Sequence, residues 1–124
     1  MKETNFCSSN KASLKIKKSA VLLRLNQKYY EGISQESLYR ITRGEWVVGE
    51  RRKRARYAFS IYRGIVLQVY RIHRWNPFTG KTPSNRQRWC FVGVVAENLQ
   101  HYVGKSVKHY FVRGNANPVN YVNC

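Results

Sequence analysis

Short apolar stretches alternate with polar and basic segments from residue 20 onward, and their spacing predicts one helix among several strands. The run Ala20 to Leu25 has the length of a strand and ends in Asn26. Periodicity alone does not distinguish so short a run from a helical turn, and we favour a buried strand. Residues 1–19 are polar, rich in Ser, Lys and Asn, and without periodicity. They are predicted to form a flexible basic arm, with an extra strand inside it as the alternative.

The strongest local pattern predicts a helix over Gln35 to Arg43. Ser34 can cap its first turn, and Ile33 and Leu38 have the spacing of a hydrophobic staple. Gly44 follows as a terminating residue. The apolar residues of this segment recur at helical spacing, so we expect the helix to cover one face of a sheet.

The remainder of the chain is rich in β-branched and aromatic residues. Strands are predicted over residues 45–49, 57–62, 65–75 and 88–96, with one or two more within 102–103 and 107–112. Arg63 and Gly64 separate two of these strands and predict a tight hairpin. Residues 76–87 contain two Pro and one Gly and predict a loop long enough to serve a function. The Asn-rich tail 113–124 is expected to wrap the surface.

Five or six strands with one early helix predict a single α+β domain over residues 20–124. We expect a small, strongly curved mixed sheet or a β-barrel, with one or two helices at its side. A chain of 124 residues has room for one modest core.

The charge of the chain is strongly positive. Lys and Arg number 23 and acidic residues number 6, which gives a formal net charge of +17. Residues 1–19 account for +4 of this total through five Lys and one Glu, so residues 20–124 keep +13. Such crowding repels itself unless a polyanion lies against it, and nucleic acid is the obvious polyanion.

The acidic residues are all Glu, and they are scattered along the chain. This scarcity argues against two-metal nucleases, Ca²⁺ loops and glycosidases, which need several carboxylates. Three distant Cys and no zinc-ligand spacing predict a reduced cytoplasmic protein with neither metal nor cofactor. No apolar run is long enough to predict a membrane span or a signal peptide.

From Ala20 to Val95 the order of elements resembles the PUA-like superfamily, which includes the ASCH, EVE and YTH domains. The segments that carry the resemblance are LLRLN, SQESLYRITRG, EWVVG, YAFSIYRGIVLQVYRIHRW and RWCFVGVV. The span from Ala20 to Val95 covers about two thirds of the chain. The resemblance implies a compact β-barrel that binds RNA or modified DNA, often with one base held in an aromatic-lined pocket.

A run of basic residues is the first candidate for phosphate contact, because Arg binds phosphate through two parallel hydrogen bonds. The run consists of Arg51, Arg52, Lys53, Arg54 and Arg56. Such runs are usually solvated surface, but the charge excess elsewhere favours binding here. Arg74, Arg86 and Arg88 are expected to extend the patch, together with Arg63, Arg71 and Lys81.

Aromatic residues offer platforms for base stacking, which contributes about 1–3 kcal/mol per base. Trp75 and Trp89 flank the predicted loop and are the first choice. Trp46 comes second, and Tyr57 and Tyr62 are weaker candidates. The alternative for each ring is an ordinary place in the core.

Two functions remain open from the sequence. The favoured one is a binding module that grips the phosphate backbone and reads a base, a modified base included, while a partner protein supplies any chemistry. The alternative is a small metal-independent ribonuclease in which His73, His101 or His109 acts as acid or base and Arg or Lys stabilises the phosphorane. No His is paired with a second catalytic residue in the sequence, which favours the module. DNA and RNA stay equally open.

Overall fold

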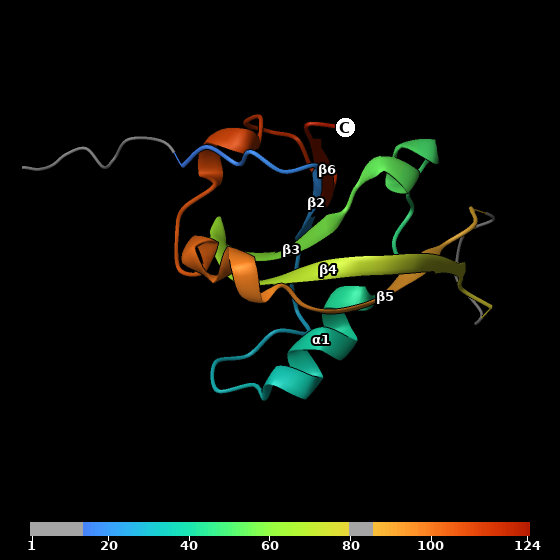
Figure 1. Cartoon of the computed structure of the whole chain (residues 1–124), viewed down its shortest axis with the longest axis horizontal. Coiled ribbons are helices and arrows are strands. Elements are labelled where there is room, and N and C mark those ends of the chain that lie inside the picture. Colours follow the sequence, from blue (N-terminus) through green and yellow to red (C-terminus); the bar gives the residue numbers. More distant parts are fainter. Residues whose placement is uncertain (1–13, 80–85) are drawn as a thin grey trace, which may run out of the picture.

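The computed structural model describes residues 14–79 and 86–124. This part of the chain forms five strands, one α-helix and short 3₁₀ helices. Figure 1 shows how these elements are arranged. The strands are β2 (Ala20–Arg24), β3 (Tyr57–Tyr62), β4 (Ile65–Pro77), β5 (Trp89–Val95) and β6 (Val119–Val122). The helices are α1 (Gln35–Arg43), η1 (Glu50–Arg54), η2 (Glu97–Tyr102) and η3 (Lys108–Tyr110).

The strands form one mixed sheet in the order β5-β4-β3-β2-β6. β2 runs parallel to β3, and the other neighbours are antiparallel. The prediction of an α+β domain with a small mixed sheet is confirmed. The β-barrel alternative is wrong, because β5 and β6 are separate edges and the sheet stays open.

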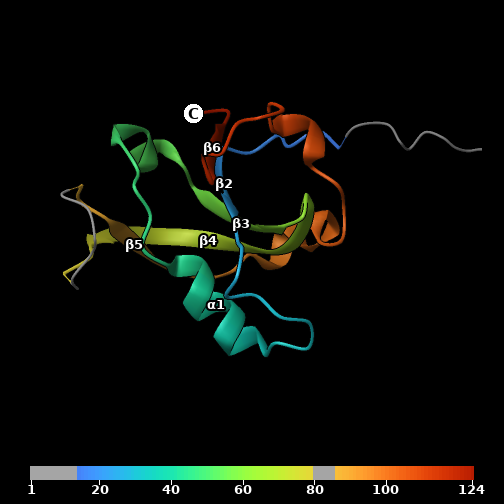
Figure 2. The same ribbon diagram turned by 180° about the vertical axis from the view of Figure 1, so that it is seen from behind.

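The sheet carries a hydrophobic core on each face. Successive residues of a strand point to opposite faces, so Leu22 of β2 joins one core while Val21 and Leu23 join the other. The first core is closed by residues 14–16 and by the segment that holds η2 and η3. On the second face, Tyr39 of α1 packs against the core. Figures 1 and 2 show these coverings on opposite sides of the sheet.

The predicted helix is confirmed with the same bounds. The Ser34 side chain accepts a hydrogen bond from the Ser37 amide at 3.1 Å, as the capping pattern required. Its buried Thr42 hydroxyl donates to the Leu38 carbonyl at 2.7 Å and lies 3.0 Å from the Ser60 hydroxyl of β3. These contacts fix the end of the helix to the middle of the sheet.

The hairpin is also confirmed. Arg63 and Gly64 both have positive φ, 51° and 80°, which is the backbone of a type I′ turn. β4 continues to Pro77, so the predicted loop 76–87 begins later than expected. Part of this loop, residues 80–85 with Lys81, lies outside the described residues.

Three other predictions are wrong, two about the end of the chain and one about residues 45–49. The strands expected within 102–103 and 107–112 are replaced by η2 and η3, whose apolar side chains fill the first core from short turns. The tail does not simply wrap the surface, since β6 pairs with β2. The segment 45–49 forms only an isolated bridge between Trp46 and Trp89 instead of a strand.

The described end of the predicted arm belongs to the domain. Ile16 is only 2% exposed, and Leu14 packs against the same core. The Ile16 amide donates to the Tyr110 hydroxyl at 2.8 Å. Leu14 and Ile16 alternate with Lys15 and Lys17, a strand-like pattern that is too short to stand out in the sequence. The boundary expected at residue 20 is therefore wrong for residues 14–19, while residues 1–13 lie outside the described part.

An Ile16→Ala variant tests this boundary. Because the side chain is enclosed, its truncation should lower the free energy of unfolding by about 2–5 kcal/mol in urea titrations. Lys17→Ala is the control, since that side chain is exposed and should change stability little. Equal stability of both variants would mean that residues 14–19 behave as a free arm.

Candidate functional site

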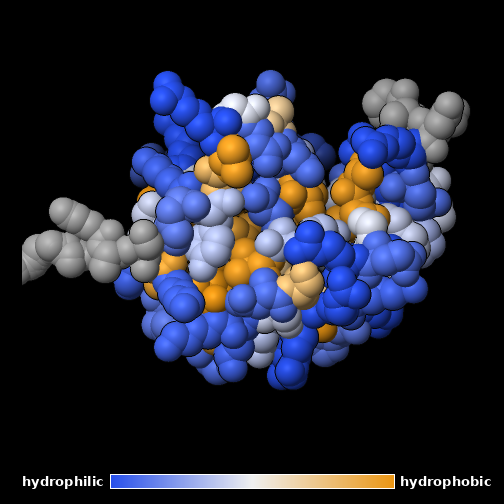
Figure 3. All heavy atoms as spheres, turned by 90° about the horizontal axis from the view of Figure 1, so that it is seen from above, coloured by the Kyte–Doolittle hydropathy of each residue, from blue (hydrophilic) through white to orange (hydrophobic). Residues whose placement is uncertain are grey.

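A cleft of about 1190 Å³ lies beside the β6 edge of the sheet. Four segments that are distant in sequence line it, within residues 24–28, 45–51, 86–88 and 115–121. Figure 3 views the molecule from the side of β6 and shows hydrophobic residues exposed between hydrophilic rims. The cleft is thus assembled by the fold and not by one stretch of chain.

The charged residues that line the cleft are five cations and one carboxylate, that of Glu45. The cations are Arg24, Lys28, Arg51, Arg86 and Arg88. This imbalance gives the cleft a positive potential, which attracts anions and raises their local concentration.

Two of these cations are held by main-chain oxygens. Arg24 Nη2 donates to the carbonyls of Asn115 at 2.9 Å and Asn117 at 2.5 Å. A peptide carbonyl carries no full negative charge, so these contacts orient the Arg24 guanidinium without neutralising it. Arg51 donates from Nε and Nη2 to the main-chain oxygen of Cys124, the last residue of the sequence, at 3.0 and 2.6 Å.

Three Asn side chains add hydrogen-bond donors. The side-chain oxygens of Asn26, Asn115 and Asn117 accept from the amides of Gln27, Asn117 and Val119, at 2.6, 2.9 and 3.0 Å. A backbone N–H can only donate, so each side-chain oxygen must face it. Their NH₂ groups have no acceptor among the described residues. The cleft therefore presents donors to an acceptor-rich ligand.

Unpaired polar atoms concentrate in the same place. Within residues 14–79 and 86–124, six buried side-chain nitrogen or oxygen atoms lack a hydrogen-bond partner, and four belong to residues of the cleft. The four are Arg24 Nε, Arg88 Nε, Asn120 Oδ1 and the Tyr121 hydroxyl. Each such atom costs about 1–3 kcal/mol. Buried polar atoms without partners are therefore concentrated in the residues that line the cleft.

The Tyr121 hydroxyl lies near the backbone of Gly49 without a hydrogen bond of good geometry. Burial raises the pKa of this hydroxyl, and the Gly49 backbone opposes the rise. The group therefore remains protonated at neutral pH and can donate a hydrogen bond.

Trp46 is the predicted base-pocket residue that lines the cleft. Its backbone exchanges two hydrogen bonds of 2.8 Å with Trp89, and its indole Nε1 donates to the Thr42 carbonyl at 2.8 Å. Gly44 makes this arrangement possible, because a Cβ there would lie 2.6 Å from Trp46 Nε1. The end of α1 thus positions the ring.

The other two Trp residues lie outside the cleft. The Arg52 guanidinium stacks over Trp89, 3.7 Å from the ring centroid. Trp75 packs edge-on against Phe91, with centroids 5.6 Å apart. Both rings are half-buried and pack against the second core, so the pair does not frame one pocket with Trp46.

The two Tyr candidates lie elsewhere. Tyr57 is buried in the first core, on the opposite face of the sheet from the three Trp residues. Tyr62 contacts Tyr29, with ring centroids 4.5 Å apart. The expected single aromatic pocket is not assembled from these residues.

The first four residues of the predicted basic run, Arg51 to Arg54, lie in the 3₁₀ helix η1. The side chains of this run lie in different surroundings. Arg51 lines the cleft, whereas Arg52 stacks on Trp89. Lys53 Nζ lies 2.8 Å from the Glu50 carboxylate, and this hydrogen bond lowers the pKa of Glu50.

The remaining predicted phosphate contacts are distributed over the surface. Arg54 and Arg56 are exposed, and their side chains make no hydrogen bond or ion pair within the described part of the chain. Arg74 lies on β4, which is three strands away from β6. Arg86 and Arg88 are brought into the cleft with Arg51.

Sequence reasoning missed most of the residues that complete the cleft. The missed residues are Arg24, Lys28, Asn115, Asn117, Asn120 and Tyr121. The Asn-rich composition of the tail was the available signal. It did not indicate a site, because the pairing of the tail with β2 cannot be recognised locally.

The three His residues of the ribonuclease alternative stand on β4, η2 and η3, outside the cleft. His109 Nε2 lies 2.7 Å from the Leu14 carbonyl and must donate to it.

The described residues contain no group of three or more His, Cys, Asp or Glu that could hold a metal ion. None of the helices within 14–79 and 86–124 is long and apolar enough to cross a membrane.

Comparisons with protein-family models, curated proteins and solved structures find no match for this chain. The resemblance to the PUA-like superfamily therefore stays a prediction.

A Gly44→Ala variant tests how Trp46 is positioned. Positive φ, here 39°, strains an L-residue by about 1–2 kcal/mol. The contact with the indole should add about 1–3 kcal/mol of overpacking. We expect a lower free energy of unfolding and a changed near-ultraviolet circular dichroism spectrum.

Gly32→Ala is the matched control. Gly32 has φ of 89°, but nothing lies within 4 Å of the position that an Ala methyl group would take, so only the backbone strain applies. If both variants lose the same stability and keep the same spectrum, Gly44 does not control the Trp46 ring.

Proposed function

We propose that the protein is a nucleic-acid-binding module and that the cleft holds the phosphate backbone. The observation that carries the proposal is the set of five cations with a single carboxylate in one cleft. Arg24 and Arg51 are already oriented by main-chain oxygens. Such preorganised guanidinium groups lose little conformational freedom when they bind phosphate oxygens.

The size and chemistry of the cleft favour a polymer over a small anion. Its volume of about 1190 Å³ exceeds the range of ordinary small-molecule sites, roughly 300–1,000 Å³. A polyanion could contact several cations at once and would release a counterion for each phosphate neutralised. The amide donors of Asn26, Asn115 and Asn117 suit phosphate and base oxygens.

An aromatic ring supports base recognition in the same cleft. Trp46 lines the cleft and offers a stacking surface, whereas the ring of Tyr121 is covered by the Arg51 guanidinium, with Cζ 4.6 Å from the ring centroid. We propose that one base, a modified base included, lies against Trp46. This function agrees with the one that the PUA-like resemblance implies.

The exposed cations outside the cleft have a supporting role in this proposal. Arg54, Arg56 and Arg74 are exposed and add to the net charge of +17. Their field attracts a polyanion to the surface and raises its association rate. They do not need to contact the bound strand.

Loss of a cleft cation should weaken binding. We expect Lys28→Ala and Arg88→Ala each to lower affinity for labelled RNA or DNA by about tenfold, because a charge-assisted hydrogen bond is worth about 1.5–3 kcal/mol. Fluorescence anisotropy over a salt series should show the log–log slope flattening by about 0.7–0.9 per variant.

Arg40→Ala is the matched control, because it removes the same charge from an exposed position on α1. It should leave both affinity and slope nearly unchanged. Equal effects of Lys28→Ala, Arg88→Ala and Arg40→Ala would refute a role for the cleft. Cleavage of RNA by the wild-type protein in EDTA, lost in a His101→Ala or His109→Ala variant, would contradict a non-catalytic module.

A further inference from the structure

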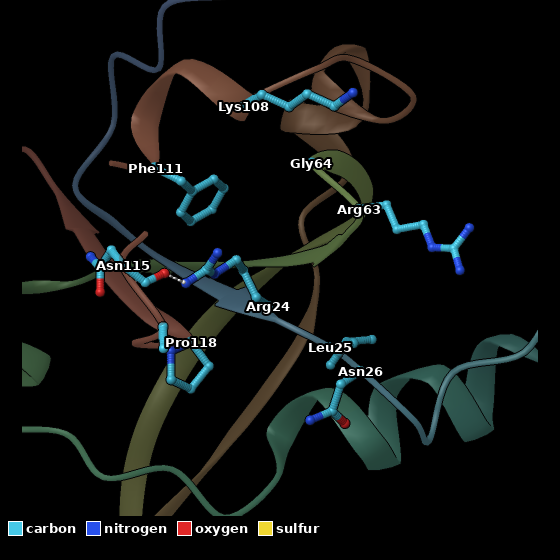
Figure 4. Close-up of a pocket in the computed structure, with 10 residues that line it drawn as sticks. Arg24, Leu25, Asn26, Arg63, Gly64, Lys108, Phe111, Asn115 and Pro118 are labelled. Atoms are coloured by element: carbon cyan, nitrogen blue, oxygen red, sulfur yellow. Dashed lines mark hydrogen bonds between the residues drawn. The ribbon is translucent and has the colours of Figure 1, made fainter. Parts of the chain in front are cut away.

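A second cavity of about 480 Å³ adjoins the cleft at the end of β2. Figure 4 shows it between the loop after β2, the β3–β4 turn and the segment 108–118. The residues that line both hollows are Arg24, Leu25, Asn26, Asn115 and Pro118. The two hollows therefore lie side by side with a common wall, and we refer to them together as the groove.

The second cavity repeats the chemistry of the cleft. Its charged residues are Arg24, Arg63 and Lys108, and no carboxylate lines it. It also contains the ring of Phe111. Cations combined with an aromatic face are the elements that bind a phosphate and the base next to it.

Arg24 stands at the junction of the two hollows. Its guanidinium lies over Phe111, with Cζ 4.6 Å from the ring centroid, and is tied to Asn115. Figure 4 shows this side chain between Phe111 and Pro118. Because it is fixed from two sides, it can contact a phosphate that lies between neighbouring nucleotides in the two hollows.

We infer that the groove binds single-stranded nucleic acid, with neighbouring nucleotides in the cleft and in the second cavity. This inference rests on the proposed function and specifies its substrate. Binding in a groove requires a strand whose bases are free to turn toward the protein. In a duplex the bases are paired with each other inside the helix, so none of them is free to enter a hollow of the protein.

Proteins that read duplex DNA usually insert a helix or a two-stranded ribbon into the major groove, which is about 12 Å wide. The cations of α1 are poorly suited to this mode. Arg40 lies 3.2 Å from Glu36, and Arg43 donates to the Phe91 carbonyl at 3.0 Å. The extended β4–β5 ribbon, which carries Arg74, is the duplex-binding alternative and an outcome of the test.

The test measures the affinity of the full chain for single-stranded oligonucleotides of about 2 to about 16 nucleotides. This range includes the number of nucleotides, about 4–16, that one OB fold covers on a single strand. Duplexes of matched length are measured beside them. Affinity should rise with length until both hollows are filled, and long single strands should bind at least about tenfold more tightly than duplexes.

Two variants isolate the second cavity. Lys108→Met removes the charge and keeps the aliphatic stem that covers Gly64. Arg63→Asn suits the positive φ of the turn and creates the favoured Asn-Gly sequence. Each variant should lower the affinity for long single strands by roughly threefold to tenfold and leave the affinity for the shortest strands unchanged. Lys105→Met is the control, since Lys105 is exposed and lines neither hollow.

The outcomes separate the inference from the proposed function. If Lys28→Ala weakens binding while Lys108→Met and Arg63→Asn behave like the control at every length, the cleft binds nucleic acid and the second cavity does not. Tighter binding of duplexes than of single strands would overturn the inference in favour of the ribbon. If no oligonucleotide binds, both proposals fail.

Discussion

The pairing of β6 with β2 is the constraint on which the site depends. In its register Leu23 lies opposite Val119, and the Arg24 amide donates to the Pro118 carbonyl at 2.9 Å. This pairing brings a segment near residue 120 beside the end of a strand near residue 20. Both hollows form at that junction, so the groove exists only when the long-range pair is made.

The elements that could be predicted from the sequence are those determined by neighbouring residues. The helix over Gln35–Arg43 follows from its cap and its periodicity, and the β3–β4 hairpin follows from two alternating runs around Arg63 and Gly64. β6 could not be predicted in this way, because its four residues lie in a polar tail and depend on β2 for their partner. The same limit explains why the apolar runs near Tyr102 and Val107 have the pattern of strands and yet form short turns.

The positive charge of the candidate site could be predicted from the sequence, but the residues that line the site could be predicted only in part. The chain has 23 Lys and Arg residues but only 6 acidic residues, so most of its cations have no side-chain carboxylate to pair with. The structure shows the consequence in Arg24, which binds two peptide carbonyls and keeps its charge. Which cations converge depends on the fold. Arg51 and Arg88 enter the cleft, whereas Arg52 and Arg74 do not.

The same features that prepare the groove for an anion also weaken the free protein. Like charges gathered in one hollow repel each other, and unpaired atoms such as Arg24 Nε and Asn120 Oδ1 lack the hydrogen bonds that buried polar groups normally make. An anion that spans the cleft would relieve the repulsion, but it would not satisfy Asn120 Oδ1, which is itself an acceptor. Ligands that bind only the folded state stabilise it. The proposed anion would therefore recover the stability that is lost where positive charges gather in one hollow.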